Sequence, residues 1–275
     1  MMKPTSLLAF ILLLAACKKE TFDVQNLNGG RIDVLGHGGS GIHSLYPLSS
    51  GSSILACLHT DADGSEVDVQ ITRDSVLVAF HSNDLSEGTD LSGPVSSRTW
   101  AEIQAARYTA IPYHAEPILR LDPFFTSAAV AQGRTFSLDL KVNPGTEPEA
   151  AYIERFARAL VRLIDAHGLS DRIYLESQHS YMLVQLRALR PSLRTFYYPP
   201  TFDEGLALAN ELDLFGVSIS TTKCTAEQVR QAHDQGRWII LWDVYSKGDN
   251  EAAVRKNPDI IQTDRIDHLL RLLDR

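Results

Sequence analysis

The chain has 275 residues, with 26 Lys and Arg against 34 Asp and Glu, so its formal net charge is −8. No basic stripe interrupts this acidic balance, which argues against a nucleic-acid partner. Removing a short N-terminal segment still leaves enough chain for one large domain with a substantial core.

The first residues have the pattern of a secretory signal. Lys3 is followed by the apolar run LLAFILLLAA, which is short for a membrane span and ends in small residues before Cys17. This resembles a bacterial lipoprotein signal, in which the cysteine is lipidated. We expect a signal peptide over residues 1–16 and a tether over 17–30, with an ordinary cleaved signal as the alternative. A lipid anchor would place the protein in the bacterial cell envelope, at the outer membrane or facing the periplasm.

Short apolar runs alternate with helical patterns along the rest of the chain. Eight runs predict buried strands, at 31–37, 65–71, 136–142, 172–178, 194–200, 215–220, 238–244 and 259–264. Helical periodicity separates most of them, at 149–168, 180–191, 202–212, 225–236 and 265–275. Strands buried on both faces and alternating with helices predict a parallel sheet, and eight such units in about 250 residues fit a TIM (β/α)8 barrel. An open doubly wound sheet is the alternative, but no helical run follows the glycine-rich GHGGSG.

A long insertion, about 82–131, separates the second and third predicted strands of the domain over 31–275. Just before it, TRDSVLVAFH predicts a turn at 73–75 and a second extended run that ends on His81.

Polar residues occur where the first strands end, which is where TIM barrels place reactive groups. Residues two apart on a strand point to the same face, so Glu66 shares a face with Asp68, and Asp139 shares one with Lys141. Neighbouring carboxylates repel, and oxygen ligands of this kind suit Ca²⁺ or Mg²⁺. Each pattern alone also fits an ion pair or a structural histidine. The residues are His37, then Glu66 with Asp68, then His81, then Asp139 with Lys141.

In their order, these motifs resemble the glycerophosphodiester phosphodiesterase family. ADGSEVDVQITRD is similar to the family's G-A-D-x-x-E-x-D-V-x-x-T-x-D, and VLVAFHSND to its V-x-x-H-D. SLDLKVN, GRWIILWDVYS and PDIIQTD resemble later family motifs, so the likeness extends over residues 32–270. The resemblance implies a TIM barrel.

The resemblance also implies roles for individual residues. His37 and His81 match the catalytic pair, although the sequence does not say which is the base. Glu66, Asp68 and Asp139 match the ligands of one divalent cation, Ca²⁺ or Mg²⁺. Trp242 would pack on glycerol or simply fill the core, and Glu176 would line the pocket or pair with a basic neighbour. Lys141 matches the lysine near the phosphate.

Two departures from the family pattern bear on activity. Where relatives carry H-R, Gly38 follows His37, which removes a bidentate phosphate donor. Where they carry P-E-N-T, this chain reads Pro47 and then LSS. Arg73, His43 or a residue of the insertion is a candidate replacement donor.

We expect a phosphodiesterase that hydrolyses small-molecule glycerophosphodiesters to glycerol 3-phosphate and an alcohol. The nucleophile is either water or the substrate's vicinal hydroxyl, which would first give a cyclic phosphate. One alternative is phospholipase D-like cleavage of lysolipids or sphingolipids to give a cyclic phosphate, which exposed apolar residues in PILRLDPFF would favour. The other is a non-catalytic lipoprotein that binds an anionic ligand, which Gly38 and the missing E-N-T would favour.

Overall fold

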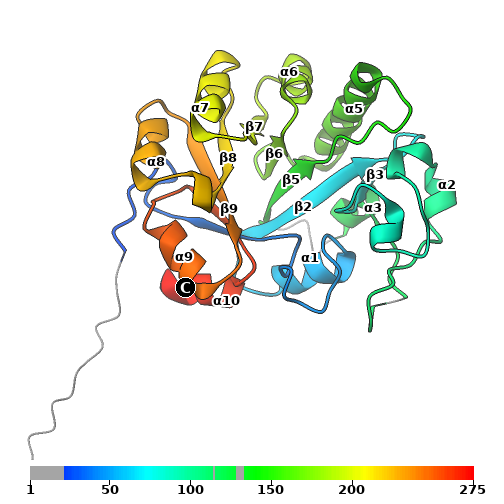
Figure 1. Cartoon of the computed structure of the whole chain (residues 1–275), viewed down its shortest axis with the longest axis horizontal. Coiled ribbons are helices and arrows are strands. Elements are labelled where there is room, and N and C mark those ends of the chain that lie inside the picture. The colour runs from blue at the N-terminus through cyan, green and yellow to red at the C-terminus, as the bar shows by residue number, and fades with distance from the viewer. Residues whose placement is uncertain (1–21, 114, 128–132) are drawn as a thin grey trace, which may run out of the picture.

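The computed structural model describes residues 22–113, 115–127 and 133–275, and eight of its strands close into a parallel barrel (Figure 1). Strand β1 pairs with both β2 and β10, which closes the ring. The barrel strands are β1 (Asp33–Gly36), β2 (Gly64–Ile71), β5 (Thr135–Leu140), β6 (Ile173–Ser177), β7 (Arg194–Tyr197), β8 (Gly216–Ser220), β9 (Trp238–Val244) and β10 (Ile260–Thr263). Each overlaps one of the eight predicted runs, so the prediction of a TIM barrel is confirmed.

Helices cover the outside of the barrel (Figure 1). In α5, Tyr152, Phe156, Leu160 and Leu163 are buried at three- and four-residue spacing, and Gly168 ends the helix at a φ of 61°. Burying one such side chain contributes about 1.5–3 kcal/mol. The helices around the barrel are α1 (Gly51–Leu58), α3 (Leu121–Thr126), α5 (Glu149–His167), α6 (Ser180–Leu189), α7 (Phe202–Glu211), α8 (Ala226–His233), α9 (Lys247–Val254) and α10 (Ile266–Leu272).

The described part of the chain between β2 and β5 includes the segment predicted as an insertion, about 82–131, and the extended run predicted just before it. Strand β3 (Leu77–Ala79) pairs antiparallel with β2, and β4 (Leu119–Arg120) pairs antiparallel with β3. Between them lie the short helices η1 (Leu85–Glu87), η2 (Val95–Ser97) and α2 (Trp100–Ile103). These elements bury a small core of their own, which includes Phe80, Ile103 and Tyr108. The insertion is therefore a packed unit that sits beside β2 (Figure 1).

Polarity changes along the barrel axis. Near the N-terminal ends of the strands the interior is apolar, with Leu35, Tyr174, Phe196, Ile240 and Ile260 in one cluster. Above this layer, Glu176 of β6 accepts hydrogen bonds from Ser137 of β5, Ser218 of β8 and Gln262 of β10. Strand β2 is buried along its whole length although Glu66, Asp68 and Gln70 alternate with apolar residues. The polar groups therefore gather towards the C-terminal ends of the strands.

The described N-terminal segment lies at the opposite end of the barrel. Phe22 packs on the apolar cluster that includes α10, and Asn26 donates to the carbonyl of Pro258, just before β10. Cys57 and Cys224 are buried free thiols. None of the helices in the described residues has the length and apolar character needed to cross a membrane.

Candidate active site

Three carboxylates meet at the C-terminal end of the barrel. Strand β2 supplies Glu66 and Asp68, and the neighbouring β5 supplies Asp139, which lies in register with Asp68. One oxygen from each carboxylate lies within 4.8 Å of the other two. Glu66 and Asp68 are buried, so their charges are poorly screened by water. The donor set is all oxygen, which fits a hard divalent cation.

The pKa values of the three carboxyl groups are shifted in different directions. Burial and the charge of Asp68 raise the pKa of Glu66 above its usual range. Burial also raises the pKa of Asp139. Burial opposes ionisation of Asp68 too, but Lys141 and His81 outweigh it and lower its pKa. A cluster that resists full ionisation in this way is stabilised by an added positive charge.

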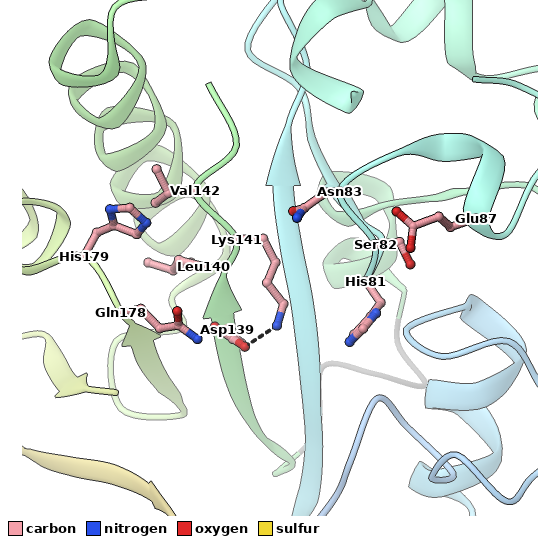
Figure 2. Close-up of a pocket in the computed structure, with 10 residues that line it drawn as sticks. All are labelled: His81, Ser82, Asn83, Glu87, Asp139, Leu140, Lys141, Val142, Gln178 and His179. Carbon is pink, nitrogen blue, oxygen red and sulfur yellow. Dashed lines mark hydrogen bonds and ion pairs between the residues drawn. The ribbon is translucent and has the colours of Figure 1, made fainter. Parts of the chain in front are cut away.

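Lys141 is the positive group that the chain itself provides. Its Nζ lies 3.0 Å from Oδ1 of Asp68 and 2.5 Å from Oδ2 of Asp139. These carboxylates raise the pKa of Lys141 despite its burial, so it stays protonated. Figure 2 shows the ammonium group directed at Asp139. The arrangement places a fixed cation beside the carboxylate cluster.

His37 follows β1 and contacts the last strand-to-helix connection. Its Nδ1 lies 2.8 Å from Oδ1 of Asp264, a carboxylate with no exposed side-chain surface. Burial lowers the pKa of His37, but the bond to Asp264 and the charge of Glu66 outweigh it and raise the pKa to about 9. The next residue, Gly38, donates its N–H to Oε2 of Glu66 at 2.6 Å. His37 is thus fixed next to the carboxylates.

His81 follows β3 and is fixed from β2. Nε2 of Gln70 donates to the carbonyls of Phe80 at 2.9 Å and Ser82 at 2.7 Å, on either side of His81. Gln70 is buried and belongs to the same face of β2 as Glu66 and Asp68. One face of β2 therefore carries two carboxylates and the amide that holds the His81 segment.

A polar cavity of about 370 Å³ opens at this point. Figure 2 shows its lining, with Lys141 and Asp139 on one side of β2 and His81 on the other. Asn83, Gln178 and His179 complete much of the remaining polar wall. The cavity can admit a small polar group next to the charged cluster.

The two departures from the family pattern lie together. Gly38 has a φ of 52°, and a Cβ there would lie 2.6 Å from Cδ2 of Leu48. Ser49 donates to Oδ2 of Asp68 at 2.8 Å, and Ser50 caps α1. The candidate replacement donor Arg73 instead contacts Glu102 and the carbonyl of Ser97 within the insertion.

Other predicted site residues have distinct surroundings. Trp242 on β9 packs against Tyr198 with the rings tilted and their centroids 4.7 Å apart, and its buried Nε1 has no hydrogen-bond partner. Glu176 lies in the polar layer inside the barrel, where burial and the charge of Asp139 raise its pKa to about 7. Substrate contact by either residue stays a prediction. Cys17 and the signal peptide lie outside the described residues.

Sequence reasoning missed Asp264 and Gln70. Asp264 falls in the motif PDIIQTD, so its strand-end position was a usable signal. Gln70 follows Glu66 and Asp68 at the same two-residue spacing, so the sequence could have placed it on the face of the strand that carries the carboxylates. Asp264 contacts His37 from the other end of the chain, and Gln70 contacts two backbone carbonyls, so spacing in the sequence could not identify these contacts.

A closed parallel barrel with clustered carboxylates, a lysine and two histidines at its C-terminal end has the features of a phosphoric diester hydrolase. Residues 41–268 match the glycerophosphoryl diester phosphodiesterase family, so the chain belongs to this family. The match begins just after His37 and Gly38. It includes the three carboxylates, Lys141 and His81.

Individual relatives agree with the family assignment. The chain is 22% identical to a glycerophosphodiester phosphodiesterase of Caldanaerobacter subterraneus over 231 residues, which cover 82% of this chain and 92% of that protein. A phosphodiesterase of Oleispira antarctica, solved with the product sn-glycerol-3-phosphate, has a TM-score of 0.78 at 21% identity, over 88% of this chain and 97% of that one. A glycerophosphodiester phosphodiesterase of Parabacteroides distasonis has a TM-score of 0.76 at 19% identity, over 93% and 98%.

Proposed function

We propose that this protein hydrolyses glycerophosphodiesters to glycerol 3-phosphate and an alcohol, with His37 and His81 as the acid–base pair. The observation that carries the proposal is the convergence of both histidines on one carboxylate cluster that also holds Lys141. The product bound to the Oleispira antarctica phosphodiesterase is glycerol 3-phosphate, which supports this choice of substrate.

Glu66, Asp68 and Asp139 would hold one divalent cation, Ca²⁺ or Mg²⁺. When bound, the cation supplies positive charge that offsets the negative charge developing on the phosphoryl oxygens. Lys141 contributes a second positive charge from its position beside Asp68 and Asp139. The mutual repulsion of Glu66 and Asp68 is the feature of the chain that favours cation binding.

The two histidines divide the proton transfers. A nucleophile adds to phosphorus, the P–O bond to the alcohol breaks, and the leaving alkoxide takes a proton. His37 is held in its protonated form by Asp264, which suits the general acid. His81 then accepts the proton of the nucleophile. If that nucleophile is water, the products are glycerol 3-phosphate and the free alcohol.

The structure bears on both alternative functions. In PILRLDPFF, Ile118, Leu121, Phe124 and Phe125 are buried, so this segment gives no support to lipid cleavage. The convergence of both histidines and all three carboxylates argues against a purely ligand-binding lipoprotein.

The test uses the purified full chain with glycerophosphocholine and glycerophosphoethanolamine, in Ca²⁺, in Mg²⁺ and in chelator. Release of glycerol 3-phosphate that is abolished by chelator and by His81→Ala supports the proposal. If no diester is hydrolysed although ligand binding is retained, the proposed phosphodiesterase function is refuted.

We also propose that Cys17 carries a lipid that anchors the protein in the cell envelope. The support is the small-residue sequence before Cys17 and the polar residues after it. Incorporation of labelled palmitate into the wild-type protein but not into Cys17→Ser tests this, and equal labelling of both would refute it.

A further inference from the structure

A groove of about 340 Å³ lies outside the catalytic cleft, where α10 meets the start of α9 and the loop after β1. Helices α9 and α10 lie side by side on this part of the barrel wall (Figure 1). Ser40 and Asp264 contribute to the lining, and Asp264 is also the buried residue that holds His37. The groove therefore adjoins the catalytic end of the barrel, but none of the three clustered carboxylates lines it.

Basic side chains dominate the lining of the groove. Lys247 is the first residue of α9. Arg265, His268 and Arg271 follow one another at three-residue spacing from the N-cap of α10 onward, so they share one face of that helix. Nε of Arg265 donates to the carbonyl of Tyr245 at 3.2 Å, which fixes the base of its side chain. A chain of net charge −8 thus gathers three permanent cations and an imidazole in one place.

Two of these cations are unpaired in the part of the chain that the structure describes. Neither Lys247 nor Arg271 forms an ion pair or a side-chain hydrogen bond there, although Asp267 is only one turn before Arg271 on α10. The other carboxylate of the lining, Asp264, is buried and has its Oδ1 on Nδ1 of His37. Positive charge in the groove is therefore available to an incoming anion.

His268 shows that the two unpaired cations act on one point. Its Nδ1 lies 3.1 Å from Nδ2 of the buried Asn250 on α9, so Nε2 is the ring nitrogen left for a ligand. Partial burial and the charges of Lys247 and Arg271 lower the pKa of His268, against an opposing effect of Glu251. An anion bound between the two cations would counter their charges and raise this pKa.

We propose that this groove binds the phosphate group of a small soluble molecule, either inorganic phosphate or a phosphomonoester. A phosphomonoester carries about 1.5 to 2 negative charges at pH 7 and offers three acceptor oxygens. These match the ammonium group of Lys247, the guanidinium fork of Arg271 and Nε2 of His268. Among the described residues that line the groove, Ile266 alone is apolar, so the lining offers little surface to a hydrocarbon chain. The inference does not depend on the proposed phosphodiesterase function.

An NMR titration of the His268 imidazole tests this without requiring turnover. Inorganic phosphate and glycerol 3-phosphate are added separately to the purified full chain, in chelator, so that no divalent cation draws them to the carboxylate cluster. The ring signals of His268, assigned by their loss in His268→Gln, should shift saturably, and the pKa of His268 should rise. Sodium chloride of the same ionic strength should do neither. An equal response to chloride, or no saturable response to the two phosphate compounds, would overturn the inference.

Variants locate the bound phosphate. Lys247→Gln and Arg271→Gln each remove one charge at an exposed position, where folding is not at risk. Each should raise the Kd for phosphate in the same titration by about tenfold, since a hydrogen bond to a charged group contributes roughly that factor. Arg162→Gln, at an exposed arginine of α5 outside the groove, is the matched control and should keep the wild-type Kd. A wild-type Kd in both groove variants would refute the site.

His81→Ala separates the groove from the catalytic cleft. This variant should leave the response of His268 to phosphate unchanged, because the groove and the cleft have no lining residue in common. If His81→Ala abolishes the response, phosphate acts on His268 from the catalytic cleft and the groove is not a site of its own.

Discussion

Oδ1 of Asp264 accepts a hydrogen bond from Nδ1 of His37 at 2.8 Å, which ties the end of the last barrel strand to the end of the first. The same oxygen accepts the N–H of Ile42 at 3.1 Å, so the loop that carries His37 is held at two points. Because Nδ1 is occupied, Nε2 is the ring nitrogen left for a substrate. Asp264 is therefore a positioning residue for His37.

Asp264→Asn should lower kcat by about 10–100-fold with a smaller effect on KM, because the orientation and charge of His37 are both disturbed. Removing the negative charge also lowers the pKa of His37 from about 9, so the alkaline limb of the kcat profile should move to lower pH. Kinetics between pH 6 and 10 measure both effects. Asp267→Asn on α10 is the control, and an identical pH profile in the two variants would contradict the assignment.

Gln70→Leu should lower kcat at least about tenfold, since the carbonyls of Phe80 and Ser82 lose the donor that fixes His81 between them. Leaving these groups unpaired should also cost about 1–3 kcal/mol of unfolding free energy. Steady-state kinetics and urea unfolding provide the two readouts. Gln104→Leu, which alters an exposed glutamine of the insertion, should leave both unchanged. Loss of stability with normal kcat in Gln70→Leu would limit Gln70 to a structural role.

Glu66→Gln should separate cation binding from stability. Millimolar Ca²⁺ or Mg²⁺ should raise the melting temperature of the wild-type protein, because a ligand that binds only the folded state stabilises it. The variant should lose most of this rise. In chelator it should be at least as stable as wild type, because the repulsion between Glu66 and Asp68 is gone. Calorimetry checks both points, with Glu227→Gln as the surface control. A full cation-dependent rise in Glu66→Gln would exclude Glu66 as a ligand.

Glu176 predicts a pH dependence of stability. Its pKa is raised by burial to about 7, above the 4.5 of an exposed glutamate, so folding favours the protonated form. This contribution is complete below about pH 4.5 and is lost as pH rises through 7, and it is on the order of 3–4 kcal/mol.

The melting temperature of wild type should therefore fall, relative to that of Glu176→Gln, by several degrees between pH 5 and 8. Glu211→Gln, at an exposed glutamate at the end of α7, should follow the wild-type curve. Parallel curves for wild type and Glu176→Gln would show that the network around Glu176 holds the ionised form without cost.

The sequence predicts most of the barrel because burial leaves a local pattern. Each parallel strand is covered on both faces, so it reads as a short apolar run, and α5 shows its inner face as a clear helical period. Helices α1 (GSSILACL) and α9 (KGDNEAAV) are harder to predict, since neither sequence has apolar residues at a clear helical spacing. Their serine caps, Ser50 and Ser246, are the remaining local signal.

The candidate site is predictable only in part for a related reason. The two-residue spacing of Glu66 and Asp68 places both carboxylates on one face of β2, and the parallel register of β5 brings Asp139 beside them. The bond between His37 and Asp264 spans most of the chain, and the fit of Leu48 against Gly38 depends on a loop conformation. Such contacts follow from closure of the barrel, and no spacing within the sequence encodes them.

The entry point of the N-terminal segment has a consequence for orientation. Phe22 packs at the end of the barrel opposite to His37 and His81, next to α10 and Arg255. Cys17 is five residues earlier, and a chain of that length spans at most about 18 Å. With a lipid on Cys17, the membrane would face the base of the barrel and the catalytic mouth would open away from it. Substrates would then arrive from the aqueous side, a route that suits soluble diesters.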